Sequence, residues 1–183
     1  MASSRAIRTA RELLMVEGVT VPSVPVDRIA RRHARVVLGE LPTEISGMLV
    51  PLPPNPSQKS WAIVVNRSHA PVRRRFTIAH ELGHLLLHRY SQLHADTDFR
   101  IRFRDGSSSL GSIREEIEAN QFAAELLMPE PLLVTYLSDL GLDYAGTREE
   151  SDDRQRRQLA RLAAKFGVSV QSLSFRIANL AQP

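Results

Sequence analysis

Apolar residues recur every three or four positions over residues 4–17, which places Ile7, Ala10, Leu13 and Leu14 on one face of a predicted helix. The same spacing predicts further helices over residues 26–33, 73–90, 112–128, 131–140, 152–165 and 170–180. Several of these segments are bounded by proline or glycine, which commonly flank helices. The pattern therefore predicts a chain in which helices predominate.

Four shorter segments show the patterns of β-strands. Residues 34–41, 45–52 and 61–66 are rich in β-branched and other apolar residues, and the last of them, WAIVVN, carries no charge. Residues 97–104 contain FRIRF, in which apolar and basic residues alternate, so this strand would have one buried and one wet face. Together, the helices and strands predict an α+β domain with a small sheet packed on helices.

A polar segment, GLDYAGTREESDD, separates the last two predicted helices from the rest of the chain. We therefore predict a domain over residues 1–140 and a helical extension over residues 141–183. Within the extension, LARLAAKFGVSVQSLSFRI resembles a helix-turn-helix, with Gly167 at the turn and Ser169 capping the second helix. In one interpretation the second helix reads DNA bases. In the other, the two helices form a hairpin that packs on the core or docks a partner.

The base-reading interpretation would use the outward positions of the second helix, which we expect to be Gln171, Ser174, Arg176 and Asn179. That helix carries a single positive charge, and the segment REESDD before the pair is acidic. Because contacts with phosphates supply much of the affinity for DNA, direct DNA binding is not expected of this tail. We therefore favour the packed hairpin.

Composition limits the chemistry that the chain can support. Its 183 residues contain no cysteine, so thiolate sites are excluded and any metal ligand must be His, Asp, Glu or Asn. No apolar run reaches the roughly 20 residues that span a bilayer, and charges interrupt the N-terminal apolar stretch, unlike a secretory signal. The net charge is +4, but the sequence contains no dense basic patch of the kind that nucleic-acid-binding proteins carry. We therefore expect a cytoplasmic protein that does not associate with membranes.

The predicted helix over residues 73–90 contains the pattern H-E-x-x-H as His80, Glu81 and His84. Residues four apart lie one turn apart on the same helix face, so two imidazoles can point at one metal ion. Zinc lowers the pKa of a water bound to it, and a neighbouring carboxylate such as Glu81 can take the proton as general base. Burying Glu81 on this apolar helix without a role would cost free energy. The pattern therefore predicts a catalytic zinc site.

Catalytic zinc uses three protein ligands and one open position, so a third ligand is expected on another element. In the downstream stretch EEIEAN, Glu116 and Asn120 are four apart and share one helix face. Glu116 can serve as the third ligand, and Asn120 can accept a hydrogen bond from a ligand imidazole and so orient it. Glu118 lies far round the helix and is expected to face solvent. The alternative is that the three glutamates of this stretch form an exposed acidic face.

The stretches RFTIAHELGHLLLH and EIEANQFAAELLMP resemble the ImmA/IrrE family of metallopeptidases. In that family, which is of the gluzincin type, H-E-x-x-H lies on one helix and a glutamate ligand lies in an E-x-x-x-[ND] motif on the next. The resemblance extends upstream through WAIVVN and ISGMLV and covers about residues 5–135. It implies a zincin-like fold with five residues at a zinc site: His80, His84 and Glu116 as ligands, Glu81 as general base and Asn120 beside a ligand.

The resemblance also implies a reaction and a partner. Members of that family cleave a protein partner at a specific site in the cytoplasm, and the partner is often a helix-turn-helix repressor of a mobile element or a stress response. We therefore predict a zinc-dependent endopeptidase whose substrate is a transcriptional repressor. The alternative is a DNA-binding or toxin–antitoxin regulator whose zincin-like site is structural or inactive. The intact Glu81 favours the peptidase, because a structural site needs no general base.

A third histidine, His88, lies two turns after His80 on the same predicted helix. The difference between a spacing of four residues and the 3.6 residues of a helical turn rotates His88 away from the pair, so it cannot easily share their ion. One alternative is that His88 contacts the substrate, a developing oxyanion or Glu116. The other, which the residues favour, is that it packs or caps the end of the helix.

Overall fold

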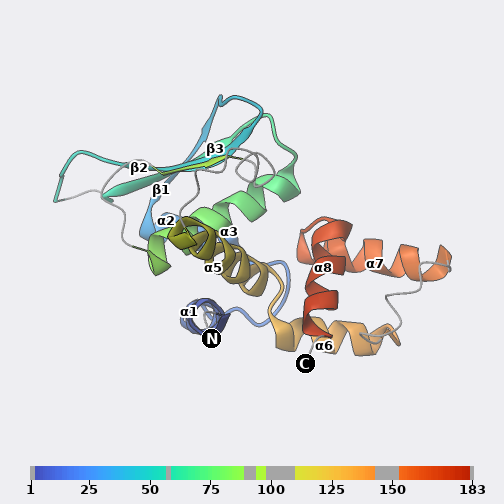
Figure 1. Ribbon diagram of the computed structural model, residues 1–183. Helices are drawn as coiled ribbons and strands as arrows, with labels where there is room; N and C mark the ends of the chain where they lie inside the picture. The colour runs from blue at the N-terminus through green and yellow to red at the C-terminus, as the bar shows by residue number, and fades with distance from the viewer. Residues whose placement is uncertain (1–2, 57–58, 89–93, 98–109, 143–152, 182–183) are drawn as a thin grey trace.

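The computed structural model describes residues 3–56, 59–88, 94–97, 110–142 and 153–181. Over this part of the chain, a four-stranded sheet forms one layer and helices cover one of its faces (Figure 1). A second group of helices lies to one side of the sheet and its covering helices (Figure 1). The α+β fold with a small sheet packed on helices, predicted from the sequence, is confirmed.

The sheet consists of β1 (Arg35–Gly39), β2 (Ile45–Pro51), β3 (Trp61–Asn66) and β4 (His94–Thr97), in the order β1-β3-β2-β4. β1 runs parallel to β3, and β2 lies antiparallel between β3 and β4. The first three strands lie where the sequence predicts them. The strand predicted over residues 97–104 lies outside the described residues except for its first residue, which ends β4.

The described helices all begin and end within three residues of their predicted bounds. They are α1 (Ser3–Val16), α2 (Val26–His33), α3 (Pro71–Leu87), α5 (Leu110–Leu127), α6 (Glu130–Asp139), α7 (Asp153–Phe166) and α8 (Val170–Leu180). Proline lies in the first turn of α3 and of α6, where its missing N–H leaves no bond unmade. Gly18 and Gly167 follow α1 and α7 with positive φ angles of 63° and 68°, a conformation that lets the chain leave a helix end.

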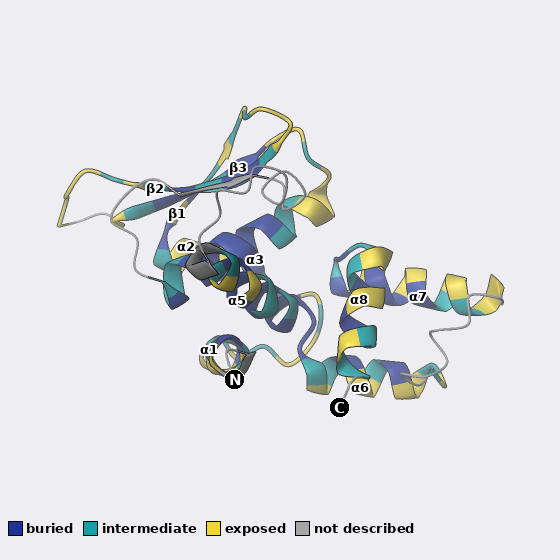
Figure 2. Cartoon of the chain, in the orientation of Figure 1, coloured by how far each residue is buried: buried dark blue, intermediate teal, exposed yellow. Residues whose placement is uncertain are grey.

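α3 is the central helix of the molecule. It packs against β2 and β3 on one side and against α5 on the other, while α1 packs against α5 (Figure 1). The largest buried side chains of this region are Ile29, Leu49, Ile63, Leu82 and Phe122. Figure 2 shows that buried positions follow α3 along much of its length. The sheet and α5 therefore shield the polar side chains in the middle of α3, which are Thr77, His80, Glu81 and His84, from water.

The C-terminal pair of helices shares this hydrophobic core. Leu162, Phe166, Leu173 and Ile177 belong to the same buried cluster as the residues of α3 and α5. The predicted cap of α8 is confirmed, since the Ser169 hydroxyl accepts a hydrogen bond from the Ser172 amide at 3.0 Å. The division of the chain into domains 1–140 and 141–183 stays a prediction.

The prediction that Arg176 faces outward is wrong. Its side chain is buried, pairs with the Glu125 carboxylate and donates from Nε to the Met128 carbonyl at 3.3 Å. The reason is that the Arg176 side chain reaches the end of α5, where Glu125 supplies a buried acceptor that the sequence of α8 does not reveal. The other three positions expected to face outward are exposed. The one cation of α8 is therefore not available to a phosphate.

Candidate metal centre

Three of the predicted site residues come together between α3 and α5. His80 Nε2 lies 3.0 Å from His84 Nε2 and 3.3 Å from Glu116 Oε2, and His84 Nε2 lies 3.5 Å from Glu116 Oε1. All three side chains are buried, and each can offer one ligand atom to a common point. The helical spacing of four places both imidazoles on the face of α3 that α5 covers. The structure therefore brings together the three residues that the sequence proposes as ligands.

The spacing of these atoms suits a tetrahedral metal ion. Zinc binds nitrogen and oxygen ligands at about 2.0–2.1 Å, which makes the edges of a tetrahedron about 3.3–3.4 Å long. The distance between the two imidazole nitrogens, 3.0 Å, and the distances from each of them to the nearer oxygen of Glu116, 3.3 and 3.5 Å, lie close to that value. Two imidazoles and one carboxylate also form a set of donors common in zinc enzymes. The residues present fit a divalent metal ion such as zinc.

Asn120 lies where it can orient one imidazole. Its Oδ1 is 3.1 Å from Nδ1 of His80. Because an amide oxygen accepts a hydrogen bond, Nδ1 of His80 donates it and Nε2 keeps its lone pair for a ligand bond. A partner of this kind fixes both the tautomer and the ring orientation of a metal-binding histidine.

Glu81 is fully buried on α3, next in sequence to His80. Its carboxylate lies against β2 at Gly47, where an added Cβ atom would be 3.2 Å from Glu81 Oε1 and 2.5 Å from Thr77 Cγ2. Gly47 therefore provides the space in which the carboxylate sits beneath the sheet. The sequence pattern gives no sign of this glycine, because its role depends on the packing of β2 on α3.

A second glycine, Gly83, permits the close approach of the two helices. An added Cβ atom would lie 2.9 Å from Cδ1 of Phe122 and 3.3 Å from the Cα and carbonyl oxygen of Ala119. The backbones of α3 and α5 thus touch one turn from the ligand atoms. A glycine within a helix lowers the free energy of unfolding by up to about 1 kcal/mol relative to alanine. The glycine inside H-E-x-x-H therefore indicates that another element packs closely there, which the sequence analysis did not recognise.

We expect Gly83→Ala to destabilise the protein and weaken metal binding. The buried Phe122 ring cannot swing away, so α5 must move, at an overpacking cost of about 1–3 kcal/mol that exceeds the gain in helix propensity. The control is Gly18→Ala, which has open space around it and strains only the backbone. Thermal unfolding and zinc titration measure both effects. Equal zinc affinity of Gly83→Ala and the parent would contradict the expectation.

The prediction that Glu118 faces solvent is wrong. Its side chain is buried, accepts a hydrogen bond from Arg114 Nε at 3.0 Å and lies 3.8 Å from Nδ1 of His88. The end of α3 covers this side of α5, and His88 is the residue that caps α3. The packing of two helices thus overrides the angular position that a single helix suggests.

Both ring nitrogens of His88 lie near groups on α5. Nε2 is 3.2 Å from the carbonyl oxygen of Glu115, and Nδ1 is near the Glu118 carboxylate. Burial of the ring lowers the pKa of His88, and the neighbouring Glu115 and Glu118 only partly oppose that shift. These contacts favour the interpretation that His88 packs at the end of the helix, whereas a contact with substrate or an oxyanion stays a prediction.

Three arginines anchor the beginning of α3. Arg73 donates to the Ser46 hydroxyl at 2.8 Å, and Arg74 donates to the Arg67 carbonyl at 3.5 Å. Arg75 donates to two carbonyls, that of Gly167 at 3.0 Å and that of Val24 at 2.8 Å. Burial lowers the pKa of Arg75. The helix that carries both imidazoles is therefore tied to the sheet and to the C-terminal helices.

Comparisons with known proteins identify the family of the chain. A model of peptidase family M78, described as the IrrE N-terminal-like domain, matches residues 43–178. The chain belongs to this family. Both helices of the site, α3 and α5, lie within the matched residues of the IrrE-like domain.

Two proteins that the chain resembles are longer than it is. The radiation response metalloprotease IrrE of Deinococcus radiodurans is 32% identical over 112 residues, which are 60% of this chain and 28% of that protein. A Mycobacterium tuberculosis transcriptional regulator shares the fold with a TM-score of 0.60 at 18% identity, over 98% of this chain and 48% of that one. The chain thus spans less than a third of the first relative and about half of the second.

None of the described helices combines the length and the apolar character that crossing a bilayer requires.

Proposed function

We propose that this chain is a zinc-dependent endopeptidase, with His80, His84 and Glu116 as zinc ligands and Glu81 as general base. The observation that carries the proposal is the convergence of three buried ligand atoms, within 4.8 Å of one another, in a chain that belongs to a peptidase family. Asn120 supports the set through its contact with His80. A merely structural site would not need the buried Glu81 beside it.

The proposed chemistry assigns a task to each side chain. When bound, zinc acts as a Lewis acid that polarises the scissile carbonyl and lowers the pKa of the attacking water. The Glu81 carboxylate accepts the proton of that water and passes it to the departing amine. Because Glu81 lies beneath the sheet and out of bulk solvent, its charge acts in a medium of low dielectric constant. Hydrogen bonding from His80 to Asn120 keeps the imidazole in the ligand orientation.

The proposed substrate is a regulatory protein, specifically a helix-turn-helix transcriptional repressor. The Deinococcus relative is a radiation response metalloprotease, and the structural relative is a transcriptional regulator. The first name supports proteolysis in a stress response and the second is compatible with control of gene expression, so we place the reaction in the cytoplasm where repressors act. The buried Arg176 further weakens the alternative in which the C-terminal helices read DNA.

The test combines metal analysis with cleavage. The purified chain is loaded with zinc, its metal content is measured, and it is incubated with candidate helix-turn-helix repressors, starting with any encoded by genes beside its own. We expect one zinc ion per chain and cleavage of the repressor at one site, which a chelator abolishes and added zinc restores. A chain that binds no zinc, or a zinc-loaded chain that leaves the repressor intact in co-expressing cells, would contradict the proposal.

Replacing Asn120 should weaken zinc binding without destroying the fold. Loss of a hydrogen-bond partner of a ligand histidine typically lowers metal affinity 10–100-fold, and we expect a loss in that range for Asn120→Ala. Asn120→Asp keeps an acceptor for His80 and should retain most of the affinity. Ile117→Ala, at an exposed position of the same helix, is the control. Competition with a chelating dye measures the affinities, and an Asn120→Ala variant within twofold of the parent would exclude the orienting role.

A further inference from the structure

The two helices that carry the metal centre, α3 and α5, are antiparallel. His80 Nδ1 lies 3.1 Å from Asn120 Oδ1, and one turn later on α3 His84 Nε2 lies 3.5 Å from Oε1 of Glu116, which is one turn earlier on α5. α3 therefore begins at the end of this helix pair where α5 ends. Figure 1 shows α7 and α8 beside that end of the pair.

The C-terminal helix pair, α7 and α8, contacts both of these helices. On α3, Arg75 donates from Nε to the carbonyl oxygen of Gly167, in the turn between α7 and α8, at 3.0 Å. On α5, Glu125 pairs with Arg176 of α8, and Arg176 Nε also donates to the carbonyl of Met128, just after α5, at 3.3 Å. The C-terminal helix pair therefore connects the start of α3 to the end of α5.

Both contacts lie at the same level along the two helices. Arg75 is five residues before His80 on α3, and Glu125 is five residues after Asn120 on α5. With a rise of about 1.5 Å per residue, each is about 7.5 Å along its helix from the contact between His80 and Asn120. The connection through α7 and α8 thus spans α3 and α5 less than two turns from the metal centre.

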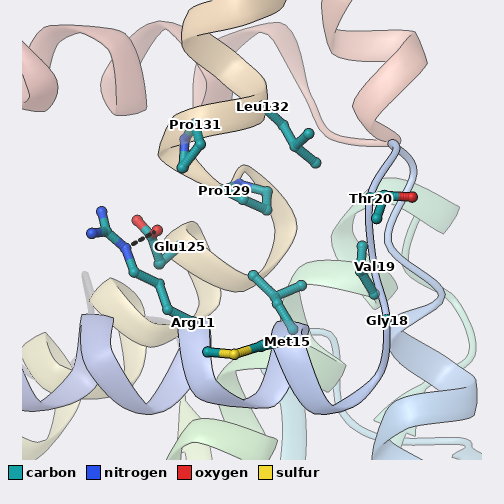
Figure 3. Close-up of a pocket in the computed structure, with 10 residues that line it drawn as sticks. Arg11, Met15, Gly18, Val19, Thr20, Glu125, Pro129, Pro131 and Leu132 are labelled. Carbon is teal, nitrogen blue, oxygen red and sulfur yellow. Dashed lines mark hydrogen bonds and ion pairs between the residues drawn. The ribbon is translucent and has the colours of Figure 1, made fainter.

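The contact on α5 is fixed from two sides. Arg176 pairs with Oε2 of Glu125, and Arg11 of α1 donates from Nε to Oε1 of the same carboxylate at 2.7 Å (Figure 3). The Glu125 side chain has no exposed surface. Because each carboxylate oxygen has its own guanidinium partner, Glu125 holds α8 in a defined position on α5.

The contact on α3 depends on the absence of a side chain at Gly167. This residue has a φ of 68°, and the three atoms nearest to an added Cβ would all belong to the Arg75 guanidinium, of which Nε would be 2.9 Å away. Arg75 Nη2 also donates to the carbonyl of Val24 at 2.8 Å, so the guanidinium joins two loops to α3. A single methyl group at Gly167 would displace the guanidinium without changing the sequence of α3.

We propose that the C-terminal helix pair controls the metal centre by setting the spacing of α3 and α5 at the level of Arg75 and Glu125. Protein interiors are nearly incompressible and transmit strain, so a shift at the start of α3 moves His80 relative to Asn120. Arg75 is a positioning residue in this arrangement, and zinc affinity depends on a contact that includes no proposed ligand. The proposal rests on the proposed zinc site and adds a means of regulating it.

Zinc titration of two glycine variants tests this proposal. Gly167→Ala displaces the Arg75 guanidinium, whereas Gly141→Ala, after α6, has a nearly equal φ of 66° and open space around the added Cβ atom. Both variants carry the same backbone strain and should lose similar stability. We expect only Gly167→Ala to raise the Kd for zinc, by at least about fivefold, the lower end of the usual coupling between two sites. Equal Kd values for the two variants would overturn the proposal.

Arginine variants show whether the effect passes through Arg75. Arg75→Met should raise the Kd for zinc at least as much as Gly167→Ala does. Arg74→Met, which removes a cation bonded to the Arg67 carbonyl from the same turn of α3, should stay within twofold of the parent. In the double variant Arg75→Met/Gly167→Ala the methyl group has no guanidinium to displace, so its Kd should equal that of Arg75→Met. A further loss in the double variant would contradict the proposed connection.

The absorption spectrum of the cobalt-loaded chain reports the geometry at the metal, which a loss of stability alone does not change. We expect an altered spectrum for Gly167→Ala and the parental spectrum for Gly141→Ala. If the parent binds no zinc, this proposal and the proposed function both fail. If the parent binds zinc and cleaves a repressor while Gly167→Ala matches Gly141→Ala in Kd and spectrum, only the control by the C-terminal helix pair is wrong.

Discussion

Replacing Glu81 with glutamine should leave the zinc content unchanged and reduce cleavage of the repressor by about 10²–10⁴-fold, the usual contribution of a general base. Glutamine has nearly the shape of glutamate, so it fills the space beside Gly47 without displacing α3. It cannot accept the proton of the attacking water at neutral pH. The variant should therefore bind zinc and substrate like the parent and fail in the chemical step.

The matched control is His84→Ala, which removes a proposed ligand instead of the proposed base. It should lose zinc and cleavage together, whereas Glu81→Gln separates the two. Elemental analysis of the purified chains and mass spectrometry of the repressor fragments measure both quantities. If Glu81→Gln cleaves at the parent rate, Glu81 is not the base and the proposed mechanism is wrong.

The largest effect on folding is expected from Glu125→Leu. The Glu125 side chain has no exposed surface, and it pairs with Arg176, which is 8% exposed, and with Arg11. Removing one partner of a buried ion pair commonly costs about 3–5 kcal/mol, because the remaining charge stays buried without compensation. We expect a loss of that size in the free energy of unfolding, since Arg176 would lose its carboxylate.

The reverse change, Arg176→Met, should cost less. Glu125 would keep its hydrogen bond from Arg11, whose length is 2.7 Å, and would remain compensated. The double variant Glu125→Leu/Arg176→Met replaces the pair by apolar side chains and should recover most of the stability, as replacement of whole buried ion pairs often does. Urea denaturation gives the free energies. A loss for Arg176→Met as large as that for Glu125→Leu would show that Arg11 does not compensate Glu125.

Patterns within single helices made the centre of this site predictable. His80 and His84 share a face because they are four residues apart, and Glu116 and Asn120 do so for the same reason. The structure brings these two faces together, with Asn120 beside His80. The apolar periodicity likewise predicted every described helix to within three residues, because these helices each bury one face.

The errors concern contacts between elements. Glu118 and Arg176 were expected in solvent because angular position on one helix takes no account of the neighbouring helix. Their partners, His88 and Glu125, lie on other elements 30 and 51 residues away in the chain. The role of Gly83 was missed for a related reason. A side chain at this position would collide with α5, and the sequence of α3 alone does not show that α5 lies so close. Such contacts depend on tertiary packing, which no local pattern encodes.

The contacts of the three arginines at the beginning of α3 determine when this helix can become anchored during synthesis of the chain. Cations in the first turn oppose the helix dipole, so this segment is a poor helix former on its own. Arg75 is compensated in part by the carbonyl of Gly167, near the C-terminal end of the chain. A nascent chain on the ribosome therefore contains both histidines long before it contains this anchor. The helix that presents them becomes fully anchored only when α7 and the turn after it have emerged.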